Sequence, residues 1–139
     1  MLNRIKVIGF DADDTLWINE NFFRQAEAEF AGLMKDYASE DEVIKTLYDV
    51  EYRNIPLYGY GIKAFMLSVM ETAIQLSHQN LDPRIINKII EIGKQMLVLP
   101  VQLLPGALEI LEALAPHHRL VLATKGDLHD QQRKLTRVS

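Results

Sequence analysis

The segment VIGFDADDTLW, residues 7–17, places three aspartates directly after a run of apolar residues. Like charges repel one another and a buried carboxylate loses its hydration, so gathering Asp11, Asp13 and Asp14 at the end of a buried element requires a reason. The run before them, residues 5–10, is mostly apolar without clean alternation, which is typical of a parallel strand buried on both faces. Open α/β sheets bind ligands at the carboxyl ends of such strands, so the aspartates are expected at a ligand-binding edge.

Four helices are expected in the middle of the chain. Apolar residues recur with a helical period over residues 22–37 and again over residues 62–74, which predicts the first and the third helix. Ser39 and the glutamate three residues later form a capping box that opens the second helix, which is expected to stop before Pro56. Asp82, followed by a proline, is the expected N-cap of the fourth helix.

The remaining residues alternate between strands and helices. A second strand is expected at residues 119–124, between a short helix that ends at Pro116 and a last helix that runs to the chain end. This alternation predicts an α/β fold with a parallel-sheet core and an inserted α-helical domain. The inserted domain is expected over residues 19–97 and the core over residues 1–18 and 98–139.

Composition excludes several classes of protein. The 139 residues are 48% hydrophobic and 24% charged, as in an ordinary soluble domain, and the net charge of −4 comes without a basic stripe for nucleic acid. The absence of cysteine excludes disulfides and thiolate metal sites. The uncharged run at residues 96–108 is too short to span a bilayer, and no signal peptide is evident. A cytoplasmic protein without a membrane partner is expected.

Asp11, Asp13 and Thr15 stand in the pattern Asp-x-Asp-x-Thr after a hydrophobic strand. This pattern resembles the first motif of the haloacid dehalogenase-like (HAD) hydrolases, and the resemblance covers the whole chain. Thr124, at the end of the second strand, matches the threonine or serine of the family's second motif. A helical cap inserted after the first motif is a known arrangement in the family. The resemblance therefore implies an incomplete Rossmann-like parallel-sheet core, with the inserted helices of residues 19–97 as its α-helical cap domain.

The resemblance also implies a chemistry. Asp11 is the expected nucleophile that forms an aspartyl-phosphate, and Asp13 is the expected acid that protonates the leaving oxygen and then activates water. Magnesium is expected between the Asp11 side chain and the backbone carbonyl of Asp13, because a carboxylate can attack a phosphate ester only when a cation screens both. The Thr124 hydroxyl, with amides near Lys125 and Gly126, is expected to bind the phosphoryl group of a small phosphorylated metabolite.

Asp13 also distinguishes two reactions within the family. Dehalogenases carry a non-acidic residue at this position because a halide leaves without a proton, whereas an alkoxide leaving group requires an acid. We therefore expect a phosphatase. Thr15 is expected to hold the loop in shape, and Asp14, where many relatives have glycine, is expected to be a solvated loop residue. Trp17 and the turn at residues 57–61 either line a substrate pocket or pack in the interior.

Two other classes of protein share some of these sequence features. A response-regulator receiver also uses clustered aspartates and magnesium, but it has no room for a long helical insertion. A non-catalytic fragment or interaction module of the same fold is the stronger alternative, because the chain ends at Ser139, before the family's third and fourth motifs. Lys125 and Lys134 come too early for the third motif, and Asp127 and Asp130 precede any further strand. The core is thus expected to be truncated after its second strand and the following helix.

A two-stranded parallel sheet leaves a row of backbone donors and acceptors unpaired along each edge. Either a second copy of the chain or further residues are expected to cover these edges. A homo-oligomer is therefore one expected state, and little or no catalytic activity is expected of the 139-residue chain alone.

Overall fold

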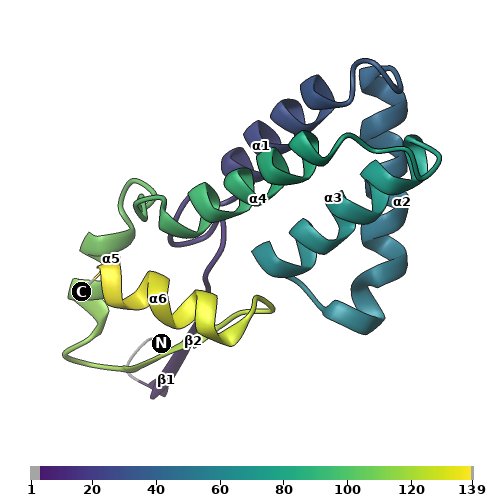
Figure 1. The fold of residues 1–139 in the computed structure, drawn as a ribbon. Coiled ribbons are helices and arrows are strands. Elements are labelled where there is room, and N and C mark those ends of the chain that lie inside the picture. The colour runs from purple at the N-terminus through teal and green to yellow at the C-terminus, as the bar shows by residue number, and fades with distance from the viewer. Residues whose placement is uncertain (1–3, 139) are drawn as a thin grey trace.

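The computed structural model describes the backbone of residues 4–138 and the side chains of residues 4–136. Helices α1 to α4 gather on one side of the molecule, and the two strands lie on the other side with α5 and α6 (Figure 1). The elements in chain order are β1 (Val7–Asp11), α1 (Glu20–Leu33), α2 (Glu40–Tyr58), α3 (Ile62–Leu76), α4 (Pro83–Val98), α5 (Ala107–Leu114), β2 (Arg119–Ala123) and α6 (Leu128–Val138).

Strands β1 and β2 pair in parallel, as predicted, and form a two-stranded sheet within the described residues. Their register places Asp11 beside Ala123, so Thr124 directly follows the partner of Asp11. The first strand starts two residues later than expected and includes Asp11 itself. This register brings together two segments that are more than one hundred residues apart in the sequence.

The prediction that the strands are buried on both faces is wrong. Alternate residues of each strand are exposed, among them Val7 at 53% and Val121 at 42%. On α5, Leu108 and Ile110 are also exposed. The reason is that, within residues 4–138, the sheet has two strands and nothing covers one of its faces.

Two separate clusters of apolar side chains are buried. The larger one lies among α1 to α4, and its members are Ala26, Phe30, Ala31, Met34, Val43, Leu47, Ile62, Phe65, Val69, Ala73, Ile89 and Met96. The smaller one lies at the β1 loop and α5 and consists of Ala12, Leu16, Trp17 and Ala107. The domain boundaries at residues 19 and 97 stay a prediction. No helix in the described part of the chain is long and apolar enough to cross a membrane.

The helix starts follow the sequence signals. The Ser39 hydroxyl accepts a hydrogen bond from the Glu42 backbone amide at 3.2 Å, so the capping residue of α2 is confirmed. At the start of α4, Asp82 accepts from the Arg84 amide at 2.9 Å, and a proline follows it in the first turn. These caps satisfy amides that have no partner inside the helix.

The predicted end of α2 is wrong, because the helix runs through Pro56 to Tyr58. Proline removes one donor, which would have bonded to the carbonyl of Tyr52, an exposed residue that water can reach. The last turn is closed instead by Gly59, whose amide donates to the Ile55 carbonyl at 2.8 Å. Gly59 adopts a φ of 69°, a conformation that glycine tolerates and that ends the helix.

Candidate active site

The carboxyl ends of β1 and β2 open onto a cavity of about 320 Å³. All five residues that the family resemblance assigned to the reaction line this cavity, namely Asp11, Asp13, Thr124, Lys125 and Gly126. The wall formed by α2, α3 and the turn between them completes the cavity. The predicted site residues therefore lie together, and their roles in the reaction stay a prediction.

Asp11 ends β1 with an exposed carboxylate. One of its oxygens, Oδ2, accepts a hydrogen bond from the Thr15 hydroxyl at 2.9 Å. Thr15 is itself held in a tight turn, in which its backbone amide donates to the Ala12 carbonyl at 3.2 Å. The turn thus orients the Asp11 carboxylate while leaving its second oxygen outside this bond.

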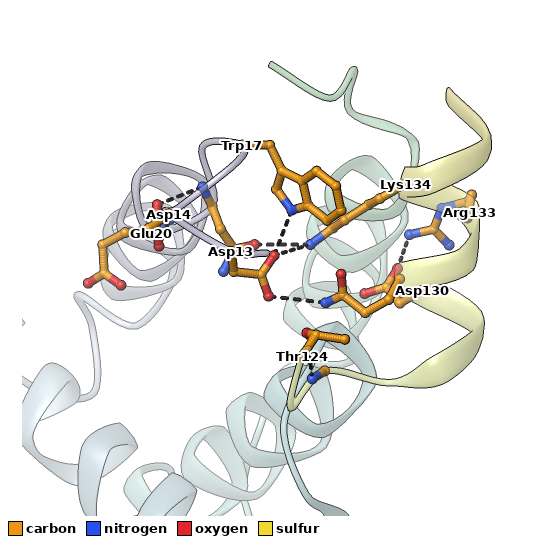
Figure 2. A network of polar contacts seen from close by, with 11 residues as sticks. Asp13, Asp14, Trp17, Glu20, Thr124, Asp130, Arg133 and Lys134 are labelled. Carbon is orange, nitrogen blue, oxygen red and sulfur yellow. Dashed lines mark hydrogen bonds and ion pairs between the residues drawn. The ribbon is translucent and has the colours of Figure 1, made fainter. Parts of the chain in front are cut away.

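Asp13 is held by three hydrogen-bond donors (Figure 2). The Trp17 indole nitrogen and the Lys134 ammonium reach its Oδ1 at 2.8 Å and 2.9 Å. The Gln131 amide nitrogen reaches its Oδ2 at 3.0 Å. Because all three partners donate, the arrangement suits the ionised carboxylate.

The site has two further residues, Gln131, which no sequence motif indicates, and Lys134, which comes too early in the chain to be assigned to the family's third motif. They lie three positions apart on α6, so they project from the same helix face toward Asp13. Lys134 also donates to the Asn19 side chain at 3.2 Å, and its ammonium lies 5.9 Å from the Trp17 ring centre. The sequence signal for both residues is their three-residue spacing directly after the second motif. It places the face of α6 that carries them near the strand ends.

The loop after β2 forms the other side of the core wall. The Thr124 hydroxyl oxygen accepts from the Gly126 amide at 3.2 Å. A side chain at Gly126 would lie 2.1 Å from the Gln131 amide nitrogen, so the missing side chain makes room for Gln131. The Lys125 ammonium lies 5.8 Å from the Tyr60 ring centre, directed at the turn between α2 and α3.

Asp14 is an exposed loop residue, as expected, but it also makes a contact that the sequence did not indicate. Its carboxylate accepts hydrogen bonds from the backbone amides of Asn19 at 2.8 Å and Glu20 at 3.0 Å, and so it caps α1 (Figure 2). Asn19 stands at the N-cap position, but its side chain makes no capping bond. Asp14 lies too far upstream for the usual capping spacing, which is why the sequence pattern does not reveal this contact.

Replacing Asp14 with alanine is expected to lower the free energy of unfolding by about 1 kcal/mol, because the first amides of α1 lose their acceptor. The residue also has a φ of 60°, which alanine adopts less readily than aspartate or asparagine. Urea unfolding measures the change, and Asp14→Asn is the control, since asparagine keeps an acceptor and tolerates this φ. Equal stability of Asp14→Ala and the unsubstituted chain would exclude the capping role.

Trp17 and the turn at residues 57–61 differ in whether they line the cavity. Trp17 is 2% exposed and packs in the smaller core cluster, so interior packing is the better description of its ring. Gly59, Tyr60 and Gly61 line the cavity. The turn, rather than the tryptophan, therefore forms part of the cavity wall.

The α2–α3 wall carries Glu51, Asn54 and Ser68. The Asn54 amide nitrogen donates to the Ser68 hydroxyl at 3.2 Å and to the Glu71 carboxylate at 2.7 Å. Burial, together with the negative charge of Glu27, raises the pKa of Glu51 to about 7, and the positive Arg24 only partly opposes this. No sequence pattern signals this cluster, because its charged residues resemble an ordinary solvated helix face.

The raised pKa of Glu51 has a consequence for stability. Because the folded-state pKa lies above the ordinary value of 4.5, the folded chain binds more protons, and stability is expected to fall as pH rises from about 4.5 to about 7. Glu51→Gln should remove this loss and gain about 1–2 kcal/mol relative to the unsubstituted chain across that window, after allowance for solvent screening. Urea unfolding at pH 4.5 and pH 8 tests it, and a pH-independent difference would contradict it.

The described residues contain no group of three or more histidine, cysteine or acidic side chains that could hold a metal ion. Asp130 lines the cavity but is buried in an ion pair with Arg133. Gln131 Oε1 is buried and has no hydrogen-bond partner among the described residues, so it is an unsatisfied acceptor on the side chain that donates to Asp13. The expected oxygen donors are the Asp11 carboxylate and the Asp13 backbone carbonyl. This donor set fits a hydrated magnesium ion held by few protein ligands.

Comparison with known proteins identifies the fold. Neither a protein-family model nor a curated protein matches the chain. A solved HAD-like family hydrolase from Xanthomonas campestris is 41% identical, with a TM-score of 0.88 over 96% of this chain and 56% of that chain. A 2-haloacid dehalogenase from Pseudomonas syringae pv. Tomato is 23% identical, with a TM-score of 0.55 over 92% and 59%. A HAD-hydrolase from Bacillus subtilis bound to magnesium is 18% identical, with a TM-score of 0.51 over 96% and 59%.

The chain thus spans a little over half the length of the solved structures that it matches. The two more distant matches show the fold alone, and they support the expected incomplete Rossmann-like core with helical cap. The Xanthomonas match adds substantial sequence identity across nearly the whole of this chain. Over the part that it spans, the chain belongs to the haloacid dehalogenase-like hydrolase superfamily.

Proposed function

We propose that the protein is a magnesium-dependent phosphate monoester hydrolase that works through an aspartyl-phosphate on Asp11. The observation that carries this proposal is the shared cavity, in which Asp11, Asp13 and Thr124 meet at the ends of two paired strands. An acidic residue at Asp13 suits an alkoxide leaving group, which requires a proton, and is unnecessary for a halide. A small phosphorylated metabolite is the proposed substrate.

In the first step, an Asp11 carboxylate oxygen attacks phosphorus, and the bond from phosphorus to the ester oxygen breaks. The leaving oxygen takes a proton from Asp13, and the Thr124 hydroxyl with the amides of the following loop holds the phosphoryl oxygens. Among the described residues, Asp13 Oδ2 accepts one hydrogen bond, from Gln131, and so keeps a lone pair for that proton, whereas Oδ1 accepts from both Trp17 and Lys134. These contacts therefore position the acid.

In the second step, water attacks the phosphorus of the aspartyl-phosphate and the bond to Asp11 breaks. Asp13, now a carboxylate, takes the proton of that water, which restores both residues and yields inorganic phosphate. The Thr15 hydroxyl keeps Asp11 in the same orientation throughout. The Asp11 carboxylate and the Asp13 backbone carbonyl would hold magnesium, which supplies positive charge between the attacking carboxylate and the phosphoryl group.

The test is a magnesium-dependent assay on sugar, nucleotide and other small phosphates. It compares the 139-residue chain with an extended chain, in which the chain is joined to the segment of the Xanthomonas relative that it does not span. Hydrolysis of phosphate esters by the extended chain is the expected result. Release of halide from a 2-haloacid without phosphatase activity would contradict the proposal.

Asp13→Asn is expected to slow hydrolysis of alkyl phosphates by about 10²–10⁴-fold, because the acid and base are lost. For p-nitrophenyl phosphate, whose leaving group needs little protonation, formation of the phosphoenzyme should be slowed far less. Single-turnover kinetics on the extended chain measure both rates. If Asp13→Asn slows phosphoenzyme formation equally for both leaving groups, Asp13 does not act as the acid.

A non-catalytic interaction module of the same fold is the second candidate. The observation that favours it is the lack, in the described residues, of a group of three or more potential metal ligands. This candidate predicts that the extended chain also fails to hydrolyse phosphate esters. The assay described above therefore separates the two candidates.

A further inference from the structure

We propose that Glu51 and Asn54 select the leaving group of the substrate, favouring an uncharged, hydroxyl-bearing group over one that carries a carboxylate or a second phosphate. This inference rests on the proposed phosphatase function and specifies the substrate class. Both residues lie on α2 and line the cavity opposite the strand ends.

The cavity has two chemically different walls. Asp11 and Thr124 fix the phosphoryl group to the core wall under the proposed mechanism, so the leaving group must point toward the α2–α3 wall. That wall is anchored over the site, because Lys63 at the start of α3 pairs with Asp127 in the loop before α6 at 3.1 Å. Gly61 approaches the same aspartate so closely that an added side chain would lie 3.2 Å from it.

Asn54 lines the cavity, and its side chain has an acceptor that its two hydrogen bonds do not use. It is 6% exposed, and its amide nitrogen is committed to Ser68 and Glu71. These two bonds fix the amide orientation, so its Oδ1 is the atom that takes no part in them. A substrate hydroxyl can donate to this oxygen, whereas a carboxylate or phosphate oxygen cannot.

Glu51 can form a hydrogen bond with a substrate hydroxyl whether its own carboxyl group is protonated or ionised. Its raised pKa, about 7, means that near neutral pH the carboxyl group exists in both forms. The protonated form donates to a substrate oxygen, and the ionised form accepts from a hydroxyl. A negatively charged leaving group would be repelled by the ionised form of Glu51, whereas Glu27 and Glu71 nearby are each paired with an arginine, Arg24 and Arg53.

The positive charges of the cavity lie on the other wall. Of its described lining residues, the cationic ones are Lys125 and Lys134, and both belong to the core segment. Lys134 is already paired with Asp13, and Lys125 lies over Tyr60. The lining residues from α2, α3 and their turn include no lysine or arginine, so a second anion has no partner there.

The test compares two substrates that differ only at the far end, glycerol 3-phosphate with an alcohol and 3-phosphoglycerate with a carboxylate. The unsubstituted extended chain is expected to favour glycerol 3-phosphate by about tenfold or more in kcat/KM. Glu51→Lys should reverse the preference, and Glu51→Gln, which keeps hydrogen bonding without charge, should weaken discrimination a few-fold. Asp49→Lys makes the same charge change on an exposed position of α2 outside the cavity and should leave the ratio unchanged.

Hydrolysis of p-nitrophenyl phosphate serves as the measure of intact chemistry and folding. If it persists in Glu51→Lys and Glu51→Gln while the ratio of the two substrates does not change, the inference is overturned. If the unsubstituted extended chain hydrolyses none of the three esters, the proposed function fails and the inference fails with it. If Asp49→Lys changes the ratio of kcat/KM for the two substrates as much as Glu51→Lys does, the effect belongs to the overall charge of the protein. This result would also overturn the inference.

Discussion

Asp11→Asn is expected to reduce phosphate monoester turnover by the extended chain at least about 10³-fold, because the attacking carboxylate is lost. The fold should be preserved. The asparagine side chain has nearly the same volume, the position is exposed, and the amide oxygen can still accept the hydrogen bond that Thr15 gives to Asp11. The free energy of unfolding is therefore expected to change by no more than about 0.5 kcal/mol.

Steady-state kinetics and urea unfolding on purified protein measure both quantities. Asp14→Asn is the matched control, because it makes the same change three residues away in a side chain that caps α1 rather than facing the reaction. The control should retain near-normal turnover. A near-normal rate in Asp11→Asn, with contamination excluded, would rule out the covalent mechanism.

The 139-residue chain alone is expected to self-associate and to show little or no turnover. Its sheet has two strands within the described residues. Apolar side chains are exposed on these strands, at Val7 and Val121, and on α5, at Leu108 and Ile110. Each edge group that is buried without a partner costs on the order of 1–3 kcal/mol, against a total stability of roughly 5–15 kcal/mol. Exposed strand edges are therefore expected to pair with another copy of the chain.

Light scattering and magnesium titration test this expectation. Val121→Lys, on the exposed face of β2, should reduce association, whereas Tyr52→Lys, on the exposed side of α2, should not. The extended chain should be less associated and should bind magnesium more tightly. A stable monomer of 139 residues that binds magnesium tightly and hydrolyses phosphate esters would show that our alignment of its C-terminal part with the family is wrong.

The sequence predicted those parts of the site that depend on local patterns. An apolar strand followed by Asp-x-Asp-x-Thr identified Asp11 and Asp13, and a second strand that ends in Thr124 placed the other half of the site beside them. The parallel pairing follows because a long helical connection, rather than a short hairpin turn, joins the two strands. The N-caps Ser39 and Asp82 were equally visible, since their acceptors act within three residues.

The contacts that the sequence did not reveal join residues at unusual or long separations. Gln131 and Lys134 reach Asp13 from α6, more than one hundred residues away, and only the fold brings them together. Asp14 caps a helix that begins six residues later, outside the usual spacing. The exposure of Val121 could not be read from its strand, because burial depends on which elements cover the sheet.

The most direct test of the central claim is to trap the phosphoryl group on Asp11. The extended chain is mixed with magnesium and a phosphate monoester, quenched rapidly in acid, and reduced with borohydride, which converts an aspartyl-phosphate to homoserine. Our account predicts homoserine at position 11 in peptide mass spectra, and none when the substrate is omitted or in Asp11→Asn. Rapid hydrolysis of the ester with unmodified Asp11 at every quench time would contradict it.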